Sequence, residues 1–291
     1  PSSSWAHPVV RPRGMHPAEG PDPLCAGQAS GGRRGELVQG ALQVLGVGGL
    51  EAGRLSAARV GEPQPYRVQP LALEPQPPHE ISLDDKWTLE RGRAFMTGTQ
   101  ALIRLPMMQR ERDLKAGLNT AGYITGYRGS PVTSIDMTAV KAKKHLDAHH
   151  VKFNPGINED LAATAVWGTQ QTNLFKDANY DGVFGMWYGK GPGVDRCGDV
   201  FKHANNAGSA KHGGVLVLAG DDHAAKSSST AHQSDHILNA CGIPVLYPAS
   251  VQEYIDYGLH AWAMSRYTGL WVSMKCVTDI IESGAVVDFD P

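Results

Sequence analysis

The 291-residue chain is poor in cysteine, in net charge and in long apolar runs. Its four cysteines lie far apart and form no Cys-x-x-Cys pair, so no zinc site, iron–sulfur ligation or disulfide framework is indicated. A formal net charge of -2 leaves no electrostatic footprint for nucleic acid. No apolar run approaches the ~20 residues of a membrane span, and no apolar segment follows the first basic residues as in a signal peptide. We therefore expect a soluble cytoplasmic protein with no nucleic-acid or membrane partner.

Residues 1–80 differ in composition from the rest of the chain. They contain no Lys, Ile, Phe, Asn or Thr, and 12 of the 19 prolines lie among them. Translation of very GC-rich DNA produces this bias, and so few core-forming residues predict disorder. We expect residues 1–80 to be a disordered extension from outside the native protein, with a functional tail as the alternative. Because the chain begins with Pro1 and not Met, we also expect it to be a piece of a longer protein.

Strand and helix signals alternate after residue 117. Short apolar segments bounded by Gly, Pro or Asp predict strands over 123–127, 151–153, 182–187, 215–219, 244–247 and 270–274. The segments between them predict helices over 133–148, 158–175, 195–207, 230–240 and 250–265. This alternation is typical of an α/β fold, a doubly wound and mainly parallel sheet of about six strands with helices on both faces. We expect it to form one domain over residues 81–291.

The segment before the first predicted strand has a helical pattern. Ser82 or Asp84 is a candidate N-cap for this helix. The helix is expected to contain Phe95 and to continue to Arg104. Pro106 should then interrupt it, because proline lacks the N–H that a helix interior requires.

Glu159 is the first candidate for chemistry. It follows a predicted strand and turn, with Asn158 as the predicted N-cap of the next helix. Glu159 and Asp160 occupy the first turn, where the positive end of the helix dipole favours carboxylates. Because open α/β sheets bind ligands beyond the carboxyl ends of their strands, we hypothesise that Glu159 is a working acid/base residue. A surface carboxylate that complements the dipole is the alternative.

Three loops follow predicted strands and should gather at one edge of the sheet. The loop over 125–131 exposes backbone amides and the Ser130 hydroxyl, and an ordinary strand-to-helix turn is the alternative. The loop over 188–199 is rich in glycine, which lets a ligand approach its backbone. Neither loop has the spacing of a P-loop or of G-x-G-x-x-G, so nucleotide phosphate binding is not supported.

The loop over 220–236 is unusually polar for a segment after so apolar a strand. If it is helical from residue 230, His232 and His236 share one face, as a zinc pair would. No H-E-x-x-H pattern and no third ligand accompany them, so polar contacts or helix capping are favoured over a metal site. A serine hydrolase is not favoured either, because the sequence has no G-x-S-x-G elbow.

Taken together, these motifs resemble the thiamine-diphosphate 2-oxoacid:ferredoxin oxidoreductases, and most of all the indolepyruvate ferredoxin oxidoreductase family in its long fused form. Gly126-Tyr-Arg-Gly-Ser-Pro131 resembles the first turn of that family's pyrimidine-binding domain, and Asn158-Glu159 resembles its Asn-Glu motif. The segment from Gly220-Asp-Asp-His223 to Gln233-Ser-Asp235 resembles a later family loop. The resemblance covers about residues 85–280 and is specific only because the motifs occur in this order.

The resemblance implies roles for individual residues. Glu159 matches the glutamate that hydrogen-bonds N1′ of the cofactor's aminopyrimidine and thereby promotes removal of the C2 proton. Arg128 matches no family role and is open between a substrate carboxylate and a neighbouring acid. The implied cofactor contacts are Gly126, Tyr127, Gly129, Ser130, Pro131 and Asn158. The implied substrate contacts are Ser130, Asp222, His223 and Ser228, with Arg128 as a further candidate and no metal ligand in this chain.

The resemblance also implies partners: a 2-oxoacid such as an arylpyruvate, coenzyme A and ferredoxin. The Gly-Asp-Gly…Asn motif that holds the diphosphate through Mg2+ is absent from these 291 residues, as is a cluster of iron–sulfur cysteines. We therefore expect Mg2+ and the iron–sulfur cluster elsewhere, in a diphosphate-binding domain of the same or a partner chain, and a homo-oligomer. The chain alone should be inactive. The alternatives are another thiamine-diphosphate enzyme, of transketolase or decarboxylase type, and a non-catalytic α/β interaction module.

Overall fold

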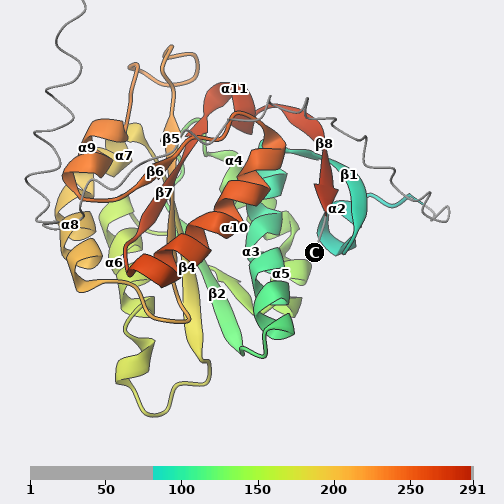
Figure 1. The fold of residues 1–291 in the computed structure, drawn as a ribbon. Helices are drawn as coiled ribbons and strands as arrows, with labels where there is room; N and C mark the ends of the chain where they lie inside the picture. The colour runs from blue at the N-terminus through green and yellow to red at the C-terminus, as the bar shows by residue number, and fades with distance from the viewer. Residues whose placement is uncertain (1–80, 290–291) are drawn as a thin grey trace, which may run out of the picture. The chain divides into compact units, whose positions relative to one another are not determined.

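The computed structural model describes residues 81–289, and the extension expected over residues 1–80 lies outside this part. Six parallel strands form the central sheet in the order β3-β2-β4-β5-β7-β6 (Figure 1). The predicted doubly wound α/β fold is therefore confirmed. The sheet strands are β2 (Thr120–Gly126), β3 (Val151–Phe153), β4 (Gly182–Lys190), β5 (Val215–Asp221), β6 (Val245–Leu246) and β7 (Val272–Val277).

Helices cover both faces of this sheet. One apolar core lies between the sheet and α3, α4, α5 and α10, and a second lies between the opposite face and α6, α7, α8 and α9. Strand β5 is buried along its whole length, as expected for a parallel strand covered on both faces. The helices are α2 (Asp85–Thr88), α3 (Gly98–Lys115), α4 (Ser134–Lys141), α5 (Lys143–Ala148), α6 (Glu159–Thr169), α7 (Gly191–Arg196), α8 (Gly198–Ala207), α9 (Asp235–Ala240), α10 (Val251–Thr268) and α11 (Thr278–Ile281).

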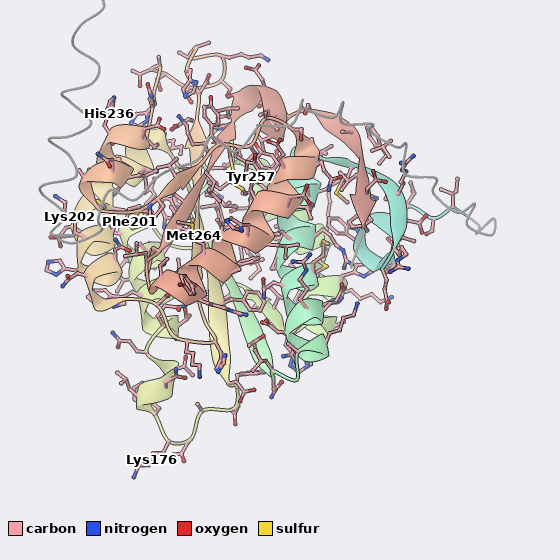
Figure 2. All side chains as sticks on the ribbon, viewed as in Figure 1. Lys176, Phe201, Lys202, His236, Tyr257 and Met264 are labelled. Carbon is pink, nitrogen blue, oxygen red and sulfur yellow. The ribbon has the colours of Figure 1, made fainter. Side chains whose placement is uncertain are left out.

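Tryptophans from both sides anchor the layers. Trp262 of α10 donates its indole N–H to the carbonyl of Gly185 on β4, at 3.0 Å. On the other face Trp187 meets Phe201 of α8 edge to face, with ring centroids 5.0 Å apart. Figure 2 labels Phe201 beside Lys202; the phenylalanine is buried and the lysine is exposed, as expected for an amphipathic helix. No helix among residues 81–289 is long and apolar enough to cross a membrane.

The prediction of a helix that contains Phe95 is wrong. The predicted segment is helical only at its ends, in α2 and in the first turns of α3, and Phe95 lies between them on β1 (Gly92–Thr97). Strand β1 pairs antiparallel with β8 (Gly284–Phe289) as a separate two-stranded sheet. Ala94 and Met96 point into the core whereas Phe95 is exposed, which is the alternation of a strand. The partner of β1 lies at the far end of the chain, so a local reading of residues 82–104 could not find it.

Pro106 does not interrupt a helix either. The helix α3 runs through it from Gly98 to Lys115, opened by a capping box between Thr97 and Gln100. An internal proline costs about 3 kcal/mol, which burial of most of α3 against the sheet and α10 offsets. Arg266 of α10 adds a two-pronged bond to Asp113 of α3, at 2.6 and 2.8 Å.

The other helices agree with the prediction in position but not always in length. The helix expected over 133–148 is divided into α4 and α5, and the one expected over 230–240 begins only at Asp235. The predicted cap of α6 is confirmed, because Asn158 accepts from the amide of Leu161 at 2.9 Å. Asp84 precedes α2 as expected but makes no side-chain capping bond. Ser250 caps α10 by accepting from the amide of Glu253 at 3.2 Å. The Glu253 carboxylate accepts from Ala249 at 2.6 Å, one residue before the position that a capping box requires.

Candidate active site

The three polar loops meet at the carboxyl ends of β2, β4 and β5. Figure 1 shows α7 and the long loop after β5 at the same end of the sheet as α11. The carbonyl of Gly126 accepts from the amide of Gly156 at 2.8 Å, which joins the first loop to the turn before Glu159. The hydroxyl of Ser228 donates to the carbonyl of Ser130 at 3.3 Å, joining the third loop to the first. The convergence predicted from the sequence is therefore present.

Glu159 lies at the first position of α6 and is only 6% exposed, so it is not the surface carboxylate of the alternative interpretation. Its backbone carbonyl accepts from the indole N–H of Trp187 at 3.1 Å. Its side chain lies against Gly193 of α7, where an added Cβ would come within 2.6 Å of Glu159 Cγ. The residue is thus held by its own helix, by β4 and by the glycine-rich loop.

One cation faces the Glu159 carboxylate. The Nη1 atom of Arg196 lies 3.7 Å from Glu159 Oε2, while its Nε donates to Asp160 Oδ2 at 2.7 Å. The hydrogen bond with Asp160 raises the pKa of Arg196, so this side chain stays charged. The short hydrogen bond of Arg196 therefore goes to Asp160. Among the described residues, no donor lies within hydrogen-bond distance of the Glu159 carboxylate.

The first loop needs its glycines because its backbone crosses β4 closely. A Cβ on Gly126 would lie 2.1 Å from the carbonyl oxygen of Tyr188, and one on Gly129 would lie 2.6 Å from Lys190 Cδ. Tyr127 donates its amide to the same Tyr188 carbonyl at 3.1 Å. The peptide bond from Ser130 to Pro131 is cis, and Ser130 is half-buried at the end of the turn.

Arg128 is exposed on this turn. Within residues 81–289 it has no carboxylate within ion-pair distance, so the pairing with a neighbouring acid that the sequence left open is not found. Its guanidinium remains available to a substrate carboxylate.

Asp222 holds the third loop in shape. Its carboxylate accepts backbone N–H bonds from Lys226, Ser227 and Ser228 at 2.7–2.9 Å. These bonds lower the pKa of Asp222 from 3.8 to about 2, and the bond from the Ser227 amide has the largest effect. Asp222 is buried and occupied by its own loop, whereas His223 beside it is exposed.

Lys275 is a buried cation at this edge that the sequence analysis missed. It is 1% exposed, and its ammonium lies 2.6 Å from Asp235 and 3.1 Å from the fully buried Asp221. Burial opposes its charge, but the hydrogen bonds with Asp235 and Asp221 outweigh burial and raise the pKa of Lys275. A single lysine inside the apolar run from Trp271 to Cys276 was the available signal, because a buried lysine requires a partner.

The zinc-type pairing of His232 with His236 does not form. Because α9 begins at Asp235, His232 lies on the preceding loop and shares no helix face with the exposed His236. His232 instead faces Asp195 and Asp221. No group of three or more His, Cys, Asp or Glu side chains within residues 81–289 is arranged to hold a metal ion.

No family model matches the sequence. The chain is 25% identical over 209 residues to the indolepyruvate oxidoreductase subunit IorA of Methanothermobacter marburgensis, covering 72% of this chain and 30% of that subunit. Its resemblance to the indolepyruvate oxidoreductases is confirmed. The IorA subunit of Pyrococcus horikoshii is also 25% identical, over 193 residues, covering 66% of this chain and 26% of that subunit.

A solved structure shares the fold. The 2-oxoglutarate:ferredoxin oxidoreductase from Magnetococcus marinus, solved with 2-oxoglutarate, coenzyme A and succinyl-CoA bound, aligns with a TM-score of 0.53 and 15% identity. The alignment covers 69% of this chain and 32% of that one. The chain thus spans about 30% of the IorA subunit from M. marburgensis, and a similar share of the oxidoreductase.

Proposed function

We propose that residues 81–291 are the pyrimidine-binding part of a thiamine-diphosphate-dependent 2-oxoacid oxidoreductase of the indolepyruvate type. The observation that carries this proposal is the burial of Glu159 at the first turn of α6, where three loops meet beyond the strand ends. The similarity to IorA subunits supports the same reaction class. The reaction assigned to the whole protein is the oxidative decarboxylation of a 2-oxoacid to its acyl-CoA, with ferredoxin as electron acceptor.

The residues present fit the aminopyrimidine of thiamine diphosphate. Among the described residues, the Glu159 carboxylate accepts no hydrogen bond from a side chain or backbone amide, although most of its surface is buried. This carboxylate faces only the exposed Arg196 at 3.7 Å among the described residues, and a protonated ring nitrogen can donate a hydrogen bond to it. The backbone of Gly193 forms one wall beside this carboxylate.

The chain's own part in the reaction is to hold and move a proton. Glu159 is positioned to bind the proton at N1′ of the pyrimidine, with its side chain buried against Gly193 and its backbone carbonyl held by Trp187. When bound, thiamine diphosphate supplies the electron sink for decarboxylation. Asn158 acts indirectly, because its side chain caps α6 and fixes the helix that carries Glu159.

The 2-oxoacid is proposed to bind over the first and third loops. Arg128 is exposed without an ion-pair partner in the described part of the chain, and Ser130 and Ser228 are joined beside it. His223 is exposed at the rim and lies 3.1 Å from the ammonium of Lys275. The guanidinium of Arg128 suits a carboxylate substrate. Mg2+, the diphosphate and the iron–sulfur centre are assigned to other domains or partner chains.

The test is the substitution of Glu159 by Gln in the full-length protein with its partner subunits. Glutamine preserves the size of the side chain but cannot exchange a proton, so oxidation of the 2-oxoacid should fall about 10²–10⁴-fold. Thermal unfolding should stay within about 1 °C, which shows that the fold is intact. A rate within twofold of the parent protein would refute the proposal and favour a non-catalytic module.

A further inference from the structure

The short helix α7 lies between Glu159 and the third loop. It begins at Gly191-Pro192, a sequence suited to a helix start because proline needs no N–H partner there. Two residues further, Gly193 contacts the Glu159 side chain. The position of α7 therefore determines how closely the backbone of Gly193 approaches the Glu159 carboxylate.

His232 of the third loop packs on the start of α7. A Cβ on Gly191 would lie 2.0 Å from Nδ1 and 2.3 Å from Cγ of the imidazole, so only glycine leaves room for the ring. The Nε2 atom lies 2.8 Å from Asp195 Oδ2, near the other end of α7. The imidazole thus touches both the first and the fifth residue of this helix.

The loop segment on either side of His232 is held by hydrogen bonds to the end of β5. Ser234 donates its amide and hydroxyl to Asp221 at 2.9 and 2.6 Å, and the buried Lys275 pairs with the same carboxylate. The amide of His232 donates to the carbonyl of Asp222 at 3.2 Å. Its Nδ1 atom is buried, has no hydrogen bond within residues 81–289, and lies 3.5 Å from Asp221 Oδ1. The ring is therefore fixed from the sheet side.

We propose that His232 is a positioning residue that holds α7 so that Gly193 stays against Glu159. His232 touches α7 and not the carboxylate, so it acts on the reaction only through the helix. The inference rests on the proposed function of Glu159 for its effect on rate, but the mechanical link from His232 to α7 stands without it. Since Asp195 is largely exposed, the ion pair itself adds little, and packing of the ring on Gly191 carries most of the effect.

The test compares His232→Ala and His232→Gln with the matched control His236→Gln in the full-length protein. His236 is exposed on α9, four residues further along the chain, and is labelled in Figure 2. Hydrogen–deuterium exchange of the amides of residues 193–197 should accelerate at least fivefold in H232A and stay unchanged in H236Q. Glutamine can reach Asp195 and cover Gly191, so H232Q should recover most of the protection.

Kinetics supply the second readout. In H232A, kcat should fall about 10- to 100-fold because the wall beside Glu159 is displaced, while KM for the 2-oxoacid stays within about twofold. Unchanged exchange and unchanged kcat in H232A would overturn the inference, and so would a global loss of protection equal to that at α7. If exchange rises at residues 193–197 while E159Q keeps full activity, the link to α7 holds and the function proposed for Glu159 fails.

Discussion

The side chain of Glu159 and the backbone of Gly193 are in direct contact, and an added Cβ at Gly193 would lie 2.6 Å from Cγ and 2.8 Å from Oε1 of the glutamate. The glycine belongs to α7 and the glutamate to α6, two helices that follow different strands. The contact brings a second loop to the carboxylate and leaves no space for water between them. The geometry of the candidate site therefore depends on a residue that carries no functional group.

Substitution of Gly193 by Ala should displace Glu159. The methyl group overlaps the carboxylate, so we expect a 10- to 100-fold loss of oxidation rate, together with a stability loss of about 1–3 kcal/mol from overpacking. Steady-state kinetics and thermal unfolding measure both. Gly168 is the matched control: it lies in α6, and no atom of the described residues comes within 4 Å of a Cβ added there. G168A should stabilise the helix by about 0.5–1 kcal/mol and keep the rate. Equal rates in the two variants would contradict the account.

Asn158 offers a test that separates capping from cofactor contact. Replacement by Ala removes the acceptor for the amide of Leu161 and should cost about 1 kcal/mol in the free energy of unfolding. Asp keeps the acceptor, so N158D should retain stability and at least half of the activity. Chemical denaturation and rate measurements decide this. A severe loss of activity in N158D with full stability would instead assign Asn158 a direct contact with the cofactor.

Lys275 of β7 pairs with Asp221 at the carboxyl end of β5 and neutralises that buried charge. Replacement by Met leaves that buried carboxylate without a cation, and we expect a loss of about 3–5 kcal/mol in the free energy of unfolding. Adding Asp221→Asn to K275M removes the unpaired charge and should restore part of the loss. A double variant less stable than K275M alone, measured by denaturant unfolding, would show that the charge pair is not the cause.

The third loop should respond to acid only far below neutrality. Backbone N–H bonds lower the pKa of Asp222 from 3.8 to about 2, so the folded loop binds this proton less readily than the unfolded chain does. Its contribution to stability is therefore fully present above pH 3.8 and is lost as the pH falls through about 2. Amide chemical shifts of Lys226, Ser227 and Ser228 should titrate with a midpoint near 2. A midpoint close to 3.8 would show that these bonds do not form.

The sheet could be predicted because its strands are buried on both faces and read as short apolar runs between Gly, Pro and Asp. The place of Glu159 at a strand-to-helix turn could be predicted, and so could the cap by Asn158, from the preference of helix N-caps. The acid/base role of Glu159 stays a prediction. The pairing of β1 with β8 could not, because it joins segments at opposite ends of the domain. Nor could the path of α3 through Pro106, which tertiary burial stabilises against local propensity.

The details of the site depend on side chains that long-range packing brings together. Asp222 was expected at the substrate and is occupied by the amides of its own loop. His232 was considered as a helical partner of His236 and lies on a loop facing Asp195. The contact of Gly193 with Glu159 could not be predicted, because glycine-rich turns have similar sequences whether or not they pack against another side chain. The assignments of cofactor and substrate contacts on the first loop stay predictions.

The 291-residue chain should bind thiamine diphosphate weakly by itself. The Gly-Asp-Gly…Asn motif for the Mg2+–diphosphate end is absent from its sequence, so only the pyrimidine contacts are available. Calorimetric titration with thiamine diphosphate and Mg2+ should show binding at least 100-fold weaker than that of the full-length protein. Tight binding by this chain alone would mean that it holds the diphosphate as well, contrary to the division of labour proposed here.

The measurement that tests the central claim most directly is the rate at which the C2 hydrogen of bound thiamine diphosphate exchanges with solvent deuterium. It needs neither the 2-oxoacid, coenzyme A nor ferredoxin, and it reports only on proton transfer that Glu159 is proposed to promote. In the full-length protein, Glu159→Gln should slow this exchange at least 100-fold with the cofactor still bound. Exchange at the parent rate in the Gln variant would show that this carboxyl group does not activate the cofactor.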